Sequence, residues 1–245
     1  MSSPTSVAVF GSTGLTGSNI LSMLLASESA WNPVHTISRR TPKSTGATLN
    51  AVVEADTDKW PPALAQITPT PSVVISAIGT TRAAAGGIQE QWKIDHDLNI
   101  LIAKTAKEAG TKIFVFMSSG GTRGPGHTYM PYCQMKNGVE DAIKDLGFET
   151  AVIMKPGAIL GEREQTRTAE SFLQKFTYGL GKISPRLKNM LGQDAEVIAR
   201  ATVKAAQMAA EGKAPEKYWV VDSDQIIKLG QPEAKPEGQA EGQKK

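Results

Sequence analysis

The fold is decided by the stretch Ser6-Val-Ala-Val-Phe10-Gly11-Ser-Thr-Gly14-Leu-Thr-Gly17, in which an apolar run leads directly into three glycines. The run is typical of a buried strand, and the apolar residues that follow the last glycine have helical spacing. A strand, a glycine turn and a helix in this order are typical of phosphate-binding turns, because the glycines allow a tight bend and the helix N-terminus offers free N–H donors. A tight turn without a ligand is the alternative interpretation. Residues expected to contact a dinucleotide are Gly11, Ser12, Thr13, Gly14, Leu15, Thr16 and Gly17.

Beyond this stretch, short apolar runs alternate with segments of helical periodicity. Strands are predicted at residues 6–11, 34–38, 50–54, 72–78, 112–118, 149–154 and 218–221. Helices are predicted at residues 14–27, 57–66, 88–109, 131–146, 166–179 and 194–211. Because several strands are wholly apolar, we expect both faces of their sheet to be buried. The pattern predicts an α/β fold, with a single Rossmann-like, doubly wound parallel sheet and helices on both faces.

The domain organisation follows from composition along the chain. Residues 1–230 are expected to form one NAD(P)-binding domain with a small lid around residues 160–190. Residues 231–245 contain no large apolar side chain to offset the entropy of ordering, which predicts a disordered tail. The N-terminus leads directly into a strand, so no targeting peptide is expected. No apolar run approaches the roughly 18 residues that a membrane span needs, so any membrane contact is expected to be peripheral.

The overall composition excludes several classes of protein. The chain has 245 residues with Lys+Arg 27 against Asp+Glu 24, a net charge of +3 that is too balanced for a dedicated nucleic-acid-binding protein. The single cysteine, Cys133, cannot form an internal disulfide, which favours a reducing compartment. The three histidines lack ligand spacing, so no metal site is expected.

The end of the second predicted strand bears on the choice of dinucleotide. It reads Ser38-Arg39-Arg40, where an NAD-selective site would usually carry an acidic residue for the ribose hydroxyls. Two arginines favour the 2′-phosphate of NADP(H), although solvated loop arginines are the alternative. Asp56, after the third strand, is either an acceptor for the adenine amino group or an ordinary loop residue.

Candidate catalytic residues follow the fifth predicted strand. The strand runs into Ser118-Ser119, and Tyr132 and Lys136 lie four residues apart on the next predicted helix. Carbonyl reduction needs a proton donor, and a nearby ammonium is expected to lower the pKa of a tyrosine toward neutrality. The lysine can also hold the nicotinamide ribose, while a serine hydroxyl bonds the substrate oxygen. Tyr129 is the rival tyrosine, but it precedes Pro131 and lies outside the expected helix.

Together these motifs resemble the short-chain dehydrogenase/reductase superfamily, in an atypical branch with glycines spaced by three. Further stretches are similar to the Tat-interacting-protein-like group, and among its members most similar to the fungal "found in mitochondrial proteome" family. They are Gly79-Thr-Thr-Arg82, Ile94-Asp-His-Asp97, Met117-Ser-Ser119, Tyr132-x-x-x-Lys136 and Lys155-Pro-Gly-Ala-Ile-Leu-Gly161.

The resemblance implies site residues by position. Gly79 would line the cofactor with the glycine turn and Arg39, and Pro156 and Gly157 would border the nicotinamide. Tyr132 lies thirteen positions after Ser119, as in many short members of the superfamily, which favours Ser119 over Ser118. Asp95 departs from the pattern, because many members place a catalytic asparagine at that position.

These observations predict an NADPH-dependent reductase of small aldehydes or ketones. The alternative is an NADP(H)-binding regulatory or scaffold protein with little or no activity. The stretch 166–188 is a substrate lid, a homodimer surface, a membrane-surface contact or an ordinary packed helix. Reasoning from the residues favours a cytoplasmic location, whereas the resemblance implies peripheral attachment to the cytosolic face of the mitochondrial outer membrane.

Overall fold

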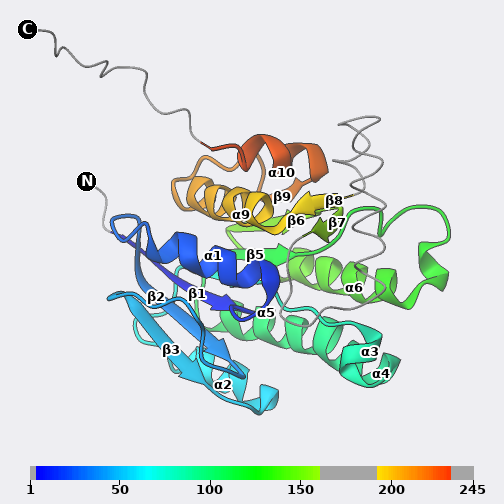
Figure 1. The fold of residues 1–245 in the computed structure, drawn as a ribbon, viewed down its shortest axis with the longest axis horizontal. Helices are drawn as coiled ribbons and strands as arrows, with labels where there is room; N and C mark the ends of the chain where they lie inside the picture. The colour runs from blue at the N-terminus through cyan, green and yellow to red at the C-terminus, as the bar shows by residue number, and fades with distance from the viewer. Residues whose placement is uncertain (1–3, 161–191, 233–245) are drawn as a thin grey trace, which may run out of the picture.

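The computed structural model describes residues 4–160 and 192–232, which form a seven-stranded parallel sheet with helices on both faces (Figure 1). The strand order is β3-β2-β1-β4-β5-β6-β9. The strands are β1 (Thr5–Phe10), β2 (Trp31–Ser38), β3 (Leu49–Val53), β4 (Val73–Ser76), β5 (Ile113–Met117), β6 (Thr150–Met154) and β9 (Tyr218–Val221). Two short strands, β7 (Ala158–Leu160) and β8 (Gly192–Asp194), pair in parallel as a separate sheet.

Two layers of helices cover the sheet. On one face α1 (Leu15–Leu25) and α9 (Ala195–Ala210) pack on the strands, and α10 (Ser223–Leu229) packs on α9. On the other face lie α2 (Trp60–Ala65), α5 (Leu98–Glu108) and α6 (Pro131–Leu146). Short helical segments complete the chain: η1 (Thr57–Lys59), α3 (Arg82–Ala85), α4 (Ile88–Trp92), η2 (Lys93–Asp97) and η3 (His127–Tyr129).

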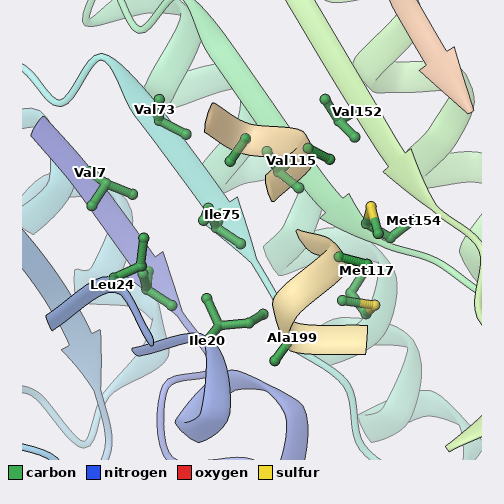
Figure 2. Packing of buried hydrophobic residues seen from close by; sticks show 14 of the residues in the cluster. Val7, Ile20, Leu24, Val73, Ile75, Val115, Met117, Val152, Met154 and Ala199 are labelled. Carbon is green, nitrogen blue, oxygen red and sulfur yellow. The ribbon is translucent and has the colours of Figure 1, made fainter. Parts of the chain in front are cut away.

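The core consists of two apolar clusters, one on each face of the sheet. Figure 2 shows the first, in which Ile20 and Leu24 of α1 and Ala199 of α9 lie against side chains from β1, β4, β5 and β6. Alternate strand residues such as Ala8 and Phe10 belong to the second cluster. Burial of both faces explains why the central strands are continuously apolar.

The seven strands of the main sheet lie where the sequence predicts them, and the α/β doubly wound class is confirmed. The predicted helix 88–109 is interrupted by the π-helical turn η2. Asn99 stabilises that turn, because its amide donates to the carbonyls of Ile94 at 3.1 Å and Asp95 at 3.2 Å. The predicted helix 166–179, and nearly all of the expected lid and tail, lie outside the described residues.

Four elements, β7, β8, α3 and α10, were not predicted from the sequence. The start of α10 does carry a sequence signal, since Asp222 and Gln225 form a capping box. None of the helices described in residues 4–160 and 192–232 combines the length and apolar character needed to cross a bilayer.

The topology brings the carboxyl ends of β1, β4, β5 and β6 to one edge of the sheet. The chain order reverses between β1 and β4, and such a reversal is where ligands bind in open α/β sheets. The glycine turn, Gly79, Ser118-Ser119 and Lys155-Pro-Gly157 all follow strands that end at this edge.

Candidate active site

The glycine turn is shaped by two close backbone approaches. Gly11 has φ +78°, and a Cβ built there would lie 2.6 Å from the carbonyl oxygen of Ala77 in the loop after β4. A Cβ on Gly17 would lie 2.1 Å from the carbonyl oxygen of Gly11. No side chain fits at either position, so the tight turn and the close packing of α1 require glycine there.

The same turn has the polar groups that a phosphate needs. The Ser12 hydroxyl is buried and has no hydrogen-bond partner among the described residues. The first turn of α1 carries no acidic residue, so the positive end of the helix dipole is not neutralised. A buried hydroxyl without a partner beside free helix N–H groups fits a dinucleotide pyrophosphate.

The loop after β2 places two cations near the turn. Arg39 and Arg40 are both exposed, and neither guanidinium forms an ion pair with another described residue. The Ser38 hydroxyl donates to the Arg40 carbonyl at 2.7 Å and thereby stabilises the loop backbone. Because β2 pairs with β1, this loop lies beside the strand that carries the glycine turn.

Asp56 has a local structural role. Its carboxylate accepts from the Asp58 N–H at 3.0 Å and caps η1. The side chain is exposed, and this cap accounts for an acidic residue at the position without a ligand.

The two serines after β5 point to different partners. The Ser118 hydroxyl is buried and donates to the carboxylate of Glu140. Ser119 is partly exposed, and its hydroxyl lies beside the phenol of Tyr132 and favours the phenolate form. Ser119 is therefore the serine that faces the candidate proton donor.

Tyr132 is the second residue of α6 and is 41% exposed. Burial of the phenol raises its pKa above the ordinary value, the Ser119 hydroxyl opposes this, and the Asp95 carboxylate adds to the increase. The pKa of Tyr132 is thus raised and not lowered as the sequence suggested, and burial of the phenol is the main cause. Tyr129, the rival, lies in η3 outside α6 with 88% of its surface exposed.

Lys136 lies one helical turn after Tyr132 and is only 4% exposed. Its Nζ donates to the Met117 carbonyl at 3.0 Å and lies 4.8 Å from the centre of the Phe116 ring. Burial lowers the pKa of Lys136, while the carboxylates of Asp95 and Glu140 raise it. An ammonium has three N–H donors, so this one retains donors for a further ligand.

Asp95 is a buried carboxylate in η2, with 1% of its surface exposed. Its Oδ1 accepts from the Thr80 N–H at 2.7 Å and its Oδ2 from the Gln91 amide at 3.1 Å. Burial raises its pKa, and Lys136, Thr80 and Gln91 counteract the increase. The residue thus connects the loop after Gly79 with α4.

The remaining expected cofactor residues meet at the same edge. The Gly120 N–H donates to the Pro156 carbonyl at 2.7 Å, which joins the serine turn to the segment after β6. The Gly157 N–H donates to the side chain of Gln193 at 3.3 Å. Gly79 is exposed at the end of the β4 loop, and a Cβ there would lie 4.0 Å from the Asp95 carboxylate.

Glu140 is a site residue that was not predicted from the sequence. This residue is 2% exposed, and besides Ser118 its carboxylate accepts from Arg123 at 3.2 Å and Lys155 at 3.0 Å. The available signal was its position four residues after Lys136, which places both on one face of α6. Arg123 and Lys155 were also given no role from the sequence.

Comparisons with known proteins agree with this architecture. A model of the NAD dependent epimerase/dehydratase family matches residues 7–220. "Protein fmp-52, mitochondrial" of Neurospora crassa is 55% identical over 238 residues, which cover 96% of this chain and 98% of that protein. "Protein FMP52, mitochondrial" of Chaetomium globosum is 55% identical over 228 residues, covering 93% and 97%.

Solved structures share the fold at low identity. "MoeE5 in complex with UDP-glucose and NAD" has a TM-score of 0.65 and 14% identity, covering 92% of this chain and 80% of that one. The Bordetella bronchiseptica enzyme WbmF in complex with NAD+ has a TM-score of 0.64 and 16% identity, covering 93% and 77%.

Proposed function

We propose that this chain, which belongs to the NAD-dependent epimerase/dehydratase family, is an NADPH-dependent reductase of small aldehydes or ketones. Within that family it belongs to the FMP52 proteins. One observation carries the proposal: Tyr132 and Ser119 present adjacent hydroxyls at the edge of the sheet that also carries the glycine turn. Lys136 lies buried one helical turn after Tyr132.

Residues of this chain fit the dinucleotide that the proposal requires. The turn Gly11 to Gly17, with its unpartnered Ser12 hydroxyl, suits the pyrophosphate. Lys136 has N–H donors left for ribose hydroxyls, and Gly79, Pro156 and Gly157 would border the nicotinamide. When bound, the reduced nicotinamide supplies the hydride.

The preference for NADPH rests on the loop after β2. Arg39 and Arg40 are exposed, and neither is engaged by a carboxylate among the described residues. Guanidinium groups bind phosphates in a bidentate manner, so either arginine suits a 2′-phosphate.

The chemistry assigned to the chain is a proton transfer. As a hydride adds to the carbonyl carbon, the π electrons move to the carbonyl oxygen, and Tyr132 gives that oxygen its phenolic proton. The Ser119 hydroxyl donates a hydrogen bond that strengthens as the oxygen gains negative charge. Solvent then returns a proton to the phenolate, which leaves the alcohol as the product.

The test is a turnover assay with purified protein. Carbonyl-dependent loss of the NADPH absorbance is measured over a panel of aldehydes and ketones, for the parent chain and for Tyr132→Phe. Turnover that requires Tyr132 supports the reductase. NADPH binding without any turnover on the panel would instead indicate an NADP(H)-binding regulatory or scaffold protein.

We also propose a mitochondrial location, because the two relatives above are named as mitochondrial proteins. The finer placement is peripheral attachment at the cytosolic face of the outer membrane. Protease treatment of intact mitochondria together with alkaline extraction tests it. Digestion in intact organelles with release at alkaline pH is the expected result, and protection from protease would refute it.

A further inference from the structure

We infer that Gln91 and Asp95 act as a pair of positioning residues, which hold the Thr80 backbone and thereby shape the loop after β4 for dinucleotide binding. The inference rests on the proposed function for its ligand, but the hold on the loop is measurable in the chain without ligand. It is carried by hydrogen bonds between buried groups.

The backbone of Thr80 is bonded through both its N–H and its carbonyl. The N–H donates to Oδ1 of Asp95 at 2.7 Å, and the carbonyl oxygen accepts from the Gln91 side-chain amide at 3.2 Å. The same amide nitrogen donates to Oδ2 of Asp95 at 3.1 Å. The Gln91 residue is 6% exposed and Asp95 is 1% exposed, so little water is available to replace these bonds.

The three bonds fix which group donates and which accepts. The Gln91 nitrogen uses both of its N–H bonds, one toward the Thr80 carbonyl and one toward Asp95. With the Gln91 amide turned over, its oxygen would face two other oxygens, so the partners allow one orientation. Asp95 must therefore accept at both of its oxygens, which a carboxylate does and a carboxamide does not.

This requirement accounts for an acidic residue at a position where many members of the superfamily carry asparagine. An amide in place of Asp95 would turn its N–H₂ group toward either the Thr80 N–H or the Gln91 nitrogen. Two buried donors would then face each other, and at least one would lose its acceptor. The acid at position 95 and the amide at position 91 thus belong together.

The loop held by this pair, residues 77–81, lies against the glycine turn. A Cβ on Gly11 would lie 2.6 Å from the Ala77 carbonyl oxygen and 3.0 Å from the Ile78 nitrogen. The backbones of the loop and of the turn are therefore in close contact. A shift of the loop would disturb the turn that suits the pyrophosphate.

The α4–η2 segment and the start of α5 anchor the chain on both sides of this loop. Before it, the Ser76 hydroxyl donates to the Asn99 side chain at 2.6 Å, and the Asn99 amide donates to the Asp95 carbonyl at 3.2 Å. Near its end, Thr80 is held by Gln91 and Asp95. A loop that is already ordered loses less conformational entropy when a ligand binds, which favours affinity.

Two single substitutions break the pair by different routes. Asp95→Asn replaces an acceptor with a donor, and Gln91→Met keeps a long side chain but removes both donors. Hydrogen exchange of the Thr80 amide, followed by NMR in the chain without ligand, should become about tenfold faster in each variant. Calorimetry should show about tenfold weaker binding of both NADPH and NADH, because the loop contacts the turn proposed for the pyrophosphate that they share.

The same substitutions at exposed neighbours are the matched controls. Gln89→Met changes an exposed glutamine of α4 two residues before Gln91. Asp97→Asn changes a carboxylate two residues after Asp95, with 58% of its side chain exposed. Both controls should leave the exchange of the Thr80 amide and the two affinities unchanged.

A double substitution tests whether the two residues act as a pair. Gln91→Glu alone puts a second carboxylate where the amide now donates to Asp95. Combined with Asp95→Asn, it lets the new amide donate to the new carboxylate and accept from the Thr80 N–H, so only the Thr80 carbonyl lacks its donor. We expect the double variant to lose less affinity and less exchange protection than the sum of the two single losses. Losses that simply add would overturn the pairing.

Unchanged exchange of the Thr80 amide in Asp95→Asn and Gln91→Met overturns the inference, and so does faster exchange with unchanged affinity for both dinucleotides. If Asp95→Asn does not fold, Gln91→Met is judged by the same criteria, because it leaves the Asp95 carboxylate its Thr80 donor. A parent chain that binds neither dinucleotide would refute the proposed function. The exchange measurements would still decide whether Gln91 and Asp95 hold the loop.

Discussion

Ser118 donates its hydroxyl to the buried carboxylate of Glu140, and this bond leaves Ser119 as the serine that faces Tyr132. The Glu140 carboxylate also binds Arg123 and Lys155, while its backbone carbonyl accepts from the hydroxyl of Tyr218 at 3.2 Å. One residue of α6 thus connects the ends of β5 and β6 with β9. The position of the serine turn depends on a carboxylate that lies outside the reacting groups.

The first prediction is that Glu140→Ala destabilises the fold strongly. The substitution leaves Lys155, whose side chain is 14% exposed, and the buried Ser118 hydroxyl without their acceptor. Removing one partner of a buried ion pair typically costs about 3 to 5 kcal/mol, and the half-exposed Arg123 places the expected loss near the lower end, roughly 3 kcal/mol. The free energy of unfolding, from urea denaturation, is the measurement.

Asp141→Ala is the control for this substitution. Asp141 binds the same Arg123 guanidinium at 2.5 Å, but its side chain is 59% exposed. Exposed ion pairs contribute about 0 to 1 kcal/mol, so this variant should remain close to the parent in stability. Equal destabilisation by the two variants would show that Glu140 acts only through Arg123.

The second prediction compares two glycines of the same turn. A Cβ on Gly17 would lie 2.1 Å from the Gly11 carbonyl oxygen, whereas a Cβ on Gly14 would lie 3.3 Å from it. Gly17→Ala must therefore move backbone, and we expect a loss of more than about 3 kcal/mol in unfolding free energy. Gly14 has φ −84°, which alanine adopts, so Gly14→Ala should lose about 1 kcal/mol or less. Thermal unfolding of both variants measures their stability, and similar losses of stability in the two variants would refute the steric argument.

Local patterns in the sequence were sufficient for the sheet and for the glycine turn. Most strands of the main sheet contain a short apolar run, and the turn between β1 and α1 depends on residues that are adjacent in the chain. Contacts between residues far apart in the sequence could not be predicted from such local patterns. Glu140 bonds Ser118 across 22 positions, and nothing in the spacing of these two residues predicts the pairing.

The pKa of Tyr132 shows the same limit. The spacing of Tyr132 and Lys136 suggested an ammonium that lowers the pKa of the phenol, because sequence spacing reveals which residues share a helical face. It does not reveal that Lys136 donates to the Met117 carbonyl, nor that burial raises the pKa of the phenol. The burial of a side chain and the charges around it depend on several helices and strands, which the residue spacing within one helix does not show.

The third prediction concerns the choice of dinucleotide. With Arg39 and Arg40 exposed after β2, NADPH should bind at least tenfold more tightly than NADH, about 1.4 kcal/mol. Arg39→Asp should reverse or abolish the preference, because a carboxylate repels the 2′-phosphate and accepts hydrogen bonds from free ribose hydroxyls. Calorimetry with both dinucleotides is the measurement. A variant that still prefers NADPH would point to Arg40 or to another part of the chain.

The last prediction separates proton donation from cofactor binding. Tyr132→Phe should reduce kcat by about 10² to 10⁴, the usual contribution of a positioned acid, while NADPH affinity stays within a fewfold of the parent. Lys136→Ala should weaken both, since the buried ammonium has donors left for a ligand and its loss also leaves the Met117 carbonyl without its partner. Steady-state kinetics and calorimetry on the two variants give distinct signatures. If Tyr132→Phe retained more than about a tenth of the parent kcat, Tyr132 would not be the general acid, and Tyr129 would be the next residue to substitute.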